Sequence, residues 1–478
     1  MKNIRRNVLR LCLALIVLFV GLGLYAAGSF LGNWDRWLTS EYNVGNRSVR
    51  ADVTAGDILD RNGVVLATVD ADGNRVYQAD ETARRSVVHV VGDMQNNVNH
   101  GVESFMSRYL YGYEFTLEEQ LAAQEAGIAK GDNVFLTIDA NLCAYIDRVF
   151  SASVPEATGA VVVLNYKTGE TLADMSFPNY DPLNVTSQVK NSPLKPFWNR
   201  AVQMQKASGS TFKIITAAAA LDNYAGMDAM STVYTCDGRL KIGDRYITDA
   251  GTDGVGEGST LVSHGSLSLR RAFALSCNNT FAYVAGQLGD RLLRKEAEKF
   301  GFNDNFLFSD IVCENSVYPV TNRTALEVAW TGAGQSALLT TPLHMCMVAA
   351  SVANDGVMME PKLVRNVVSQ TGILRKTMTS KAYRTVMEPA VAAILKSYMR
   401  EVVTNGTGSR AAVNGHVICG KTGSSERDDQ TETDAWFVGF IDEAQSPYAV
   451  CVVVENAGGG GSVSAPIARQ IFQYLLNH

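Results

Sequence analysis

The longest apolar stretch of the chain lies close to its first residue. Leu11 to Leu31 are 21 consecutive uncharged residues, and a helix rising about 1.5 Å per residue over this length crosses a hydrocarbon core of about 30 Å. Four basic residues and no acidic one precede the stretch, whereas acidic residues begin at Asp35. The positive-inside rule therefore predicts a cytoplasmic basic tail at 1–10, a transmembrane anchor at 11–31 and an extracytoplasmic remainder. A cleaved signal peptide is the alternative, but its apolar core usually has only about 7–15 residues.

Residues 35–150 contain a strong hairpin signal. Asn62-Gly63 stands between the apolar pairs Ile58-Leu59 and Val64-Val65. Both turn residues tolerate positive φ, so this pattern predicts two antiparallel strands joined by a tight turn.

A second unit opens at Gly159. Its first two strands are predicted to form a hairpin, and helical sequence dominates from about 210 to 400. Three apolar strands near the C-terminus are joined by loops too short for crossover helices, so they should be antiparallel. A last helix is predicted to begin with Ser464 as its N-cap. The strands are expected at 160–164, 170–173, 417–419, 435–440 and 448–454.

Composition excludes several classes of protein. Hydrophobic residues make up 46% and charged residues 19% of the 478 positions, which excludes disordered and fibrous chains. A net charge of −6 without a long basic run argues against nucleic-acid binding. The eight cysteines include no Cys-x-x-Cys pair and the six histidines have no ligand spacing, so we expect neither a metal nor a cofactor. Cys236 and Cys313 are the best candidates for a disulfide.

Ser210 and Lys213 form the first candidate for chemistry. They lie three residues apart at the start of an apolar helix, and this spacing places both on one helix face. A buried lysine can lose its proton and activate the serine, and the helix N-terminus favours an oxyanion. The same Ser-x-x-Lys spacing recurs at 187–190 and 192–195, but in a polar loop without a predicted helix start.

Two further elements follow along the chain. Ser276-Cys277-Asn278 comes after an apolar helical run, and its hydroxyl and amide could transfer protons and bind a peptide. Lys421-Thr422-Gly423-Ser424 lies at the end of a strand, where the ammonium and hydroxyl groups could bind a carboxylate. A second Lys-Thr-Gly at 167–169 occupies a predicted hairpin turn, and we interpret it as structural.

A Ser-x-x-Lys helix, a Ser-x-Asn turn and a Lys-Thr-Gly strand in this order are the signature of penicillin-binding proteins and class A β-lactamases. The chain resembles the class B, monofunctional penicillin-binding proteins over most of residues 45–478. Its short membrane-proximal region is most similar to the penicillin-binding protein A type. The resemblance rests on Gly56–Gly63, Asn199–Ala201, Gly334-Gln335 with Thr341–Leu343, Lys421–Gly423 and Trp436–Phe440.

The sequence departs from the family pattern in three places. Ser208 replaces a common proline, Cys277 occupies the middle of Ser-x-Asn, and Ser424-Ser425 follow Lys-Thr-Gly. Each change substitutes one small residue for another and leaves the catalytic atoms in place. These positions therefore bear on β-lactam affinity rather than on the reaction.

The resemblance implies an α+β penicillin-binding/transpeptidase fold, with a five-stranded antiparallel sheet flanked by helices. Residues 35–150 would form a pedestal of dimerisation type and 155–478 the transpeptidase domain. In that family pattern Ser210 attacks the D-alanyl-D-alanine carbonyl of a stem peptide, with its own N–H and that of Ser424 around the oxyanion. The other implied roles are base for Lys213, proton relay for Ser276, donor-peptide contact for Asn278, and carboxylate binding along Lys421, Thr422, Gly423 and Ser424.

The same resemblance implies the setting of the reaction. The protein would sit in the bacterial plasma membrane, act on peptidoglycan stem peptides, bind β-lactams and work with a glycan polymerase of the elongation or division machinery. Two alternatives stay open: a D,D-carboxypeptidase or β-lactamase-type hydrolase, in which water resolves the acyl-enzyme, and a catalytically idle cell-wall scaffold. The anchor and pedestal argue against a secreted hydrolase, and the intact motif set argues against a scaffold.

Overall fold

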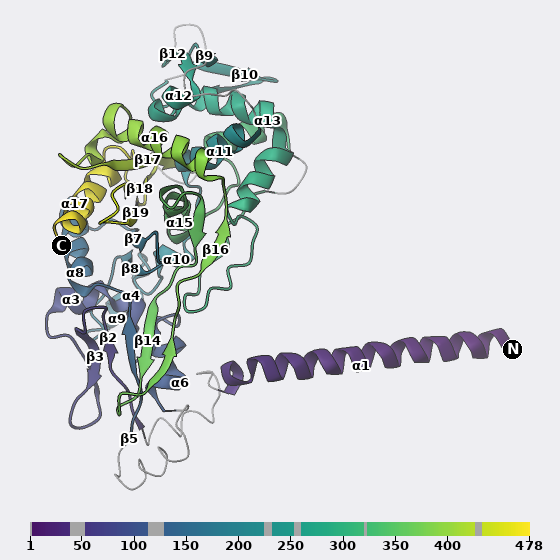
Figure 1. Ribbon diagram of the computed structural model, residues 1–478, viewed down its shortest axis with the longest axis vertical. Helices are drawn as coiled ribbons and strands as arrows, with labels where there is room; N and C mark the ends of the chain where they lie inside the picture. The colour runs from purple at the N-terminus through teal and green to yellow at the C-terminus, as the bar shows by residue number, and fades with distance from the viewer. Residues whose placement is uncertain are drawn as a thin grey trace.

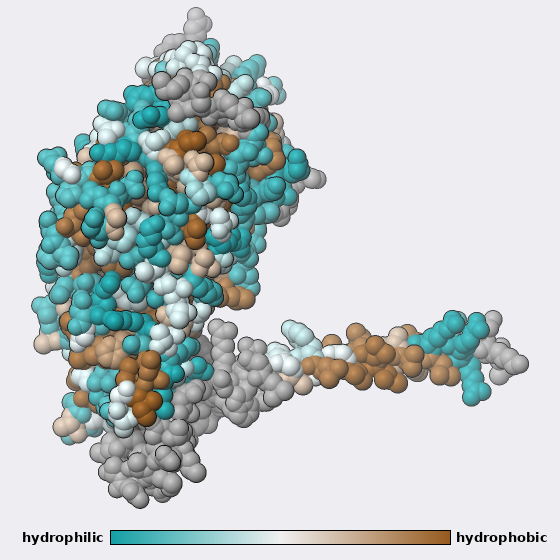
Figure 2. All heavy atoms as spheres, viewed as in Figure 1, coloured by the Kyte–Doolittle hydropathy of each residue, from teal (hydrophilic) through white to brown (hydrophobic). Residues whose placement is uncertain are grey.

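Helix α1 (Lys2–Leu38) contains the predicted anchor. Its segment Ile4–Ser29 is long and apolar enough to cross a membrane, and none of its most apolar window is buried by the described part of the protein. Figure 1 shows α1 apart from the rest of the fold, and Figure 2 shows an apolar band along its middle beside a hydrophilic N-terminal end. The computed structural model describes residues 2–38, 53–112, 129–223, 232–252, 260–319, 323–425 and 433–478.

A five-stranded antiparallel sheet forms the centre of the body, in the order β17-β18-β19-β7-β8. Nearly all of its residues are buried because α15 (Pro342–Ala353) packs on one face and α17 (Ser464–Asn477) with α8 (Ala140–Ser153) on the other (Figure 1). This confirms the predicted sheet and its antiparallel C-terminal strands. The strands are β7 (Gly159–Asn165), β8 (Thr171–Phe177), β17 (Ile418–Ser425), β18 (Asp434–Ile441) and β19 (Tyr448–Val454).

Helices dominate the region beside this sheet, as predicted, but short strands interrupt them. Within the described residues, β9 pairs with β12 and β10 with β11, both antiparallel. Strand β10 alternates polar and apolar residues over only four positions and β12 contains a single apolar residue, so patterns this short did not identify these strands. The helices are α9 (Ser187–Lys190), α10 (Arg200–Gln203), α11 (Lys213–Asn223), α12 (Leu269–Leu275), α13 (Asn278–Lys299), α14 (Ala325–Ala333) and α16 (Pro389–Asn405); the strands are β9 (Thr232–Cys236), β10 (Arg239–Ile242), β11 (Arg245–Thr248), β12 (Gly265–Ser268), β13 (Val357–Met359) and β16 (Ala382–Thr385).

A second sheet, of six strands, lies at the pedestal end in the order β15-β14-β6-β2-β3-β4. The predicted Asn62-Gly63 hairpin is confirmed, because β2 and β3 pair antiparallel and Gly63 has a φ of 83°. Strands β14 and β15 come from far along the chain, and β14 pairs with β6, so the boundaries predicted from the sequence omit this hairpin. Residues 39–52 and 113–128 of the predicted pedestal lie outside the described residues. The elements are β1 (Val53–Thr54), β2 (Ile58–Leu59), β3 (Val65–Val69), β4 (Arg75–Tyr77), α3 (Glu81–Ser86), α4 (Val88–Val91), α5 (Val102–Phe105), α6 (Ser107–Leu110), β5 (Ala129–Lys130), β6 (Asn133–Leu136), β14 (Val364–Val368) and β15 (Leu374–Thr377).

Two local predictions are wrong. Ser464 is the first residue of α17 rather than its N-cap, and its hydroxyl donates to the carbonyl of Ala435 at 2.8 Å, which ties the helix to β18. Cys236 and Cys313 form no disulfide: both are buried free thiols. Cys236 Sγ lies 3.3 Å from a carboxylate oxygen of Asp249, whereas Cys313 Sγ lies 3.5 Å from the hydroxyl of Thr341.

Candidate active site

Ser210 lies in a 3₁₀ turn, Gly209–Phe212, that leads directly into α11. Buried apolar residues on both sides of Lys213 anchor this turn in the core. The Nζ atom of Lys213 lies 2.7 Å from Ser210 Oγ, and the lysine side chain is fully buried. The i,i+3 spacing therefore brings the predicted nucleophile and the predicted base into direct contact.

The competing motifs lie elsewhere. Ser187 begins the short helix α9, contrary to the loop expected there, but Ser187 and Lys190 are both exposed. The second Lys-Thr-Gly forms the turn between β7 and β8, where Gly169 has a φ of 76°. The first observation favours Ser210 as the serine of the site, and the second favours Lys421–Gly423 as its Lys-Thr-Gly motif.

The Ser-x-Asn motif forms the junction between α12 and α13. Ser276 ends α12 in the left-handed conformation, with a φ of 61°, which is a strained backbone for a residue other than glycine. Asn278 Oδ1 accepts a hydrogen bond from Lys213 Nζ at 2.7 Å, and its amide nitrogen donates to the carbonyl of Thr248 at 3.1 Å. Asn278 thus positions Lys213 and keeps one amide hydrogen for another acceptor.

The Lys-Thr-Gly strand is the end of β17. Lys421 Nζ lies 2.9 Å from Ser276 Oγ, and that oxygen is 3.4 Å from Lys213 Nζ, so Ser276 lies between two lysines. The hydroxyl of Thr422 contacts that of Thr407 at 2.5 Å. The structure brings together all the predicted site residues, from three regions of the chain.

Glycines permit the turn that carries Ser210 to lie directly against β17. A Cβ atom at Gly209, whose φ is 55°, would lie 2.4 Å from the carbonyl oxygen of Ser424. A Cβ atom at Gly334, whose φ is 97°, would lie 1.8 Å from the carbonyl oxygen of Gly209. The side chain of Gln335 donates to Ser424 O at 3.2 Å. Because the two backbones approach this closely, the Gly209–Phe212 turn and strand β17 form one wall of the site.

Two buried ammonium groups define the electrostatics. Burial lowers the pKa of Lys213 to about 8, although the Asp249 carboxylate acts in the opposite direction. Burial and the neighbouring charge of Lys213 lower the pKa of Lys421. At a pKa of about 8, roughly one tenth of Lys213 is neutral at pH 7 and about half at pH 8. The base expected from the sequence is therefore available near neutral pH, but only as a fraction of the molecules.

A cleft of about 890 Å³ opens over these groups, lined by Ser210, Ser276, Asn278, Thr422, Gly423 and Ser424. Sequence reasoning missed Asp249 and Thr407, which line the same cleft. Asp249 accepts a hydrogen bond from the backbone N–H of Asn278. No motif signals either residue, because each is defined only by its neighbours in space.

Four side chains of metal-ligating type also lie together beside Asn278: Cys236, Asp249, His264 and Cys277. The sequence led us to expect no metal, since none of these residues stands at a familiar ligand spacing. They come from separate elements, which only the fold brings together.

The profile of the penicillin binding protein transpeptidase domain matches residues 159–473. The chain belongs to this family. It is 32% identical to the peptidoglycan D,D-transpeptidase PbpA of Mycolicibacterium smegmatis over 365 residues, which covers 71% of this chain and 72% of the relative. PbpA of Mycobacterium tuberculosis is 31% identical over 371 residues, or 73% of each chain. The resemblance of this penicillin-binding protein to the class B, PbpA type is thus confirmed.

Solved structures support the same family assignment. The structure of penicillin-binding protein A of M. tuberculosis as a ceftriaxone acyl-enzyme complex superimposes with a TM-score of 0.78 at 27% identity, covering 89% of this penicillin-binding protein and 99% of that chain. The D,D-transpeptidase domain of a peptidoglycan glycosyltransferase from Eggerthella lenta gives a TM-score of 0.75 at 27% identity, with the same coverage. These similarities confirm the predicted fold class.

Proposed function

We propose that this protein is a peptidoglycan D,D-transpeptidase that cross-links stem peptides through an acyl-enzyme at Ser210. One observation carries the proposal: Ser210 Oγ lies 2.7 Å from the fully buried Nζ of Lys213, in the cleft that also holds Ser276 and Ser424. The relatives named PbpA, which are peptidoglycan D,D-transpeptidases, and the ceftriaxone acyl-enzyme of a similar structure support it.

Acylation begins with neutral Lys213. Its amine accepts the hydroxyl proton of Ser210 while Oγ bonds to the carbonyl carbon of the penultimate D-alanine. The developing oxyanion accepts hydrogen bonds from the backbone N–H groups of Ser210 and Ser424. Inside a cleft from which the substrate displaces water, such fixed donors stabilise the transition state strongly.

Departure of the terminal D-alanine needs a proton on its nitrogen. Ser276 Oγ lies 3.4 Å from Lys213 Nζ, so this hydroxyl can pass the proton held by Lys213 to the leaving amine as the C–N bond breaks. Lys421, Thr422 and Ser424 hold the terminal carboxylate. The free amide hydrogen of Asn278 binds the donor peptide.

An amine of a neighbouring stem peptide then attacks the acyl-enzyme, which forms the cross-link and releases Ser210. A β-lactam acylates the same serine, but its leaving nitrogen stays tethered to the acyl group. The covalent adduct therefore persists and reports on the nucleophile.

Labelling with fluorescent penicillin tests the nucleophile. Wild-type protein and the control variants Ser187→Ala and Ser192→Ala should carry the label, and Ser210→Ala should not. Peptide mapping by mass spectrometry identifies the modified serine. An adduct on either control serine would refute the assignment.

A product assay separates the transpeptidase from the hydrolase and the scaffold. The protein receives a stem-peptide substrate ending in D-alanyl-D-alanine, with and without an acceptor peptide that carries a free amine. We expect a cross-linked product that requires both the acceptor and Ser210. Hydrolysed peptide alone, at every acceptor concentration, would favour the carboxypeptidase, and no product at all would favour the scaffold.

The topology belongs to the same proposal. Residues 1–10 lie in the cytoplasm, 11–31 cross the plasma membrane, and the pedestal and transpeptidase domains lie outside, where a glycan polymerase supplies strands. The apolar segment of α1 supports this arrangement. A C-terminal reporter active only in the cytoplasm should remain silent, and a mature N-terminus near Gly28 would show cleavage instead.

A further inference from the structure

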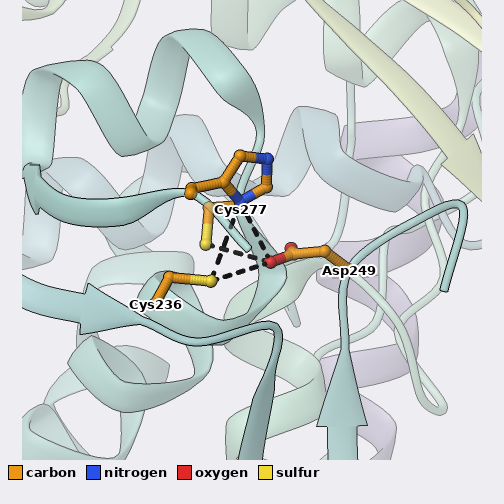
Figure 3. Close-up of side chains that lie close together, drawn as sticks. Cys236, Asp249 and Cys277 are labelled. Carbon is orange, nitrogen blue, oxygen red and sulfur yellow. Dashed lines mark hydrogen bonds and ion pairs between the residues drawn. The ribbon is translucent and has the colours of Figure 1, made fainter. Parts of the chain in front are cut away.

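The small strands beside the cleft bring four potential metal ligands close together. Cys236 ends β9, Asp249 follows β11, and His264 precedes β12. Cys277 is the N-cap of α13. One ligand atom from each residue lies within 4.8 Å of the other three. Figure 3 shows the sulfur atoms of Cys236 and Cys277 directed toward the carboxylate of Asp249.

Four of the six separations between the ligand atoms are close to those of a tetrahedron. Asp249 Oδ2 lies 3.2 Å from Cys277 Sγ, 3.3 Å from Cys236 Sγ and 3.2 Å from His264 Nδ1. Cys236 Sγ lies 3.7 Å from His264 Nδ1. Tetrahedral zinc binds sulfur at about 2.3 Å and nitrogen or oxygen at about 2.0–2.2 Å, which places neighbouring ligand atoms about 3.3–3.8 Å apart. These four separations therefore need to change by only a few tenths of an ångström to surround an ion, and the remaining two lie within 4.8 Å.

We propose that Cys236, Asp249, His264 and Cys277 bind one structural Zn²⁺ ion. Two thiolates, an imidazole and a carboxylate form a donor set that suits zinc, and four protein ligands leave no open position for catalysis. Both thiols lose a proton when the ion binds. Two positive charges enter as two protons leave, so with a neutral imidazole the net charge next to Lys213 does not change.

Neighbouring groups hold the ligands in place. The side-chain amide of Asn279 donates to Cys236 Sγ at 3.3 Å, and the backbone N–H and hydroxyl of Thr280 donate to Cys277 Sγ at 3.4 and 3.2 Å. Asp249 Oδ1 accepts the backbone N–H of Asn278, which leaves Oδ2 for the ion. Donors of this kind orient metal ligands and stabilise thiolates.

The ion would cross-link the strands β9–β12 to the Ser-x-Asn turn. Beneath the β10–β11 hairpin, only a small cluster of buried apolar residues, Ile247, Ala282 and Ala329, is present among the described residues. A metal can supply the stability that so small a core does not. Because Cys277 lies between Ser276 and Asn278, which both contact Lys213, loss of the ion should also disturb the base.

Metal content is the first test. Full-length protein is purified in detergent without chelators or a polyhistidine tag, and zinc is measured by mass spectrometry in wild type, Cys236→Ser, His264→Ala and the control Cys313→Ser. Wild type and the control should hold about one equivalent, and the two ligand variants should bind zinc more weakly by about tenfold or more. Cys313 is a matched control because it is buried and free but lies outside the cluster.

Cobalt provides a test that does not depend on how well the variants fold. Reduced wild-type protein loaded with Co²⁺ should show thiolate-to-cobalt charge transfer and the visible bands of a tetrahedral site, and a strong chelator should abolish these bands and lower the melting temperature. The proposal is overturned if the reduced protein binds neither metal. It is also overturned if Cys236→Ser retains zinc as well as wild type does, or if unreduced protein contains a Cys236–Cys277 disulfide.

Discussion

Replacing Lys213 with arginine distinguishes between two roles of this residue, a general base and a structural cation. Lys213 Nζ has three acceptors within 3.0 Å: Ser210 Oγ, Asn278 Oδ1 and the carbonyl of Ser276. A guanidinium can satisfy such acceptors but keeps its proton at any accessible pH. It would therefore donate to Ser210 Oγ and could not accept the hydroxyl proton.

The magnitude follows from the loss of proton transfer. A positioned general base contributes about 10²–10⁴-fold to a rate, and Lys213 is the buried amine in direct contact with the nucleophile. Taking the middle of this range, Lys213→Arg should slow acylation by about 10³-fold, or about 4 kcal/mol of barrier. If Lys213 only formed ion pairs, replacement by arginine would change the acylation rate little.

The acylation rate constant is measured with a chromogenic β-lactam, and thermal unfolding checks that the variant folds. Lys206→Arg is the matched control, because Lys206 is also a buried lysine but forms an ion pair with Asp434 at 2.9 Å. Its acylation rate should stay close to that of wild type. A Lys213→Arg rate within about tenfold of wild type would rule out the base role.

Three further results are expected. The acylation rate should rise with pH around a midpoint of about 8, since burial lowers the pKa of Lys213 and the neutral amine is the active form; a rate that is constant from pH 6 to 9 in stopped-flow measurements would contradict this. Gly334→Ala should cost about 1–3 kcal/mol in the free energy of unfolding, because it adds a clash to a left-handed backbone. Gly415→Ala, with a φ of 83° and open space around it, is the control, and equal losses in chemical denaturation would show that the clash is irrelevant. Thr407→Val removes the hydroxyl that contacts Thr422 and should weaken substrate binding by about 0.5–1.5 kcal/mol; an unchanged KM would exclude that contribution.

Local patterns predicted the parts of the site that lie within one element. Ser210 and Lys213 meet because helical geometry fixes residues three apart, and Lys421 to Ser424 lie along one strand whose apolar residues place it in the central sheet. The antiparallel C-terminal strands followed in the same way from short loops and apolar runs. In each case the information is contained in a few neighbouring residues.

The remaining features depend on contacts across the fold. Asp249 has no motif of its own, and its importance comes from reaching Asn278 and the two cysteines at once. The same holds for Cys236. The sequence suggested Cys313 as its disulfide partner, but the fold places Cys236 beside Asp249 and Cys277. Spacing along a chain does not encode which loops meet in space, so these neighbours required the structure.

The β14–β15 hairpin determines how the protein can be divided. Strand β14 pairs with β6, and the hydroxyl of Thr137 donates to the carbonyl of Lys362 at 2.8 Å, just before that hairpin. A truncated protein that begins at residue 155 would retain the hairpin but lose β6. The unpaired backbone donors and acceptors of β14 would then be exposed, which promotes aggregation. A chimera that exchanges pedestals between relatives must therefore transfer residues 364–377 together with the N-terminal segment, as a single discontinuous module.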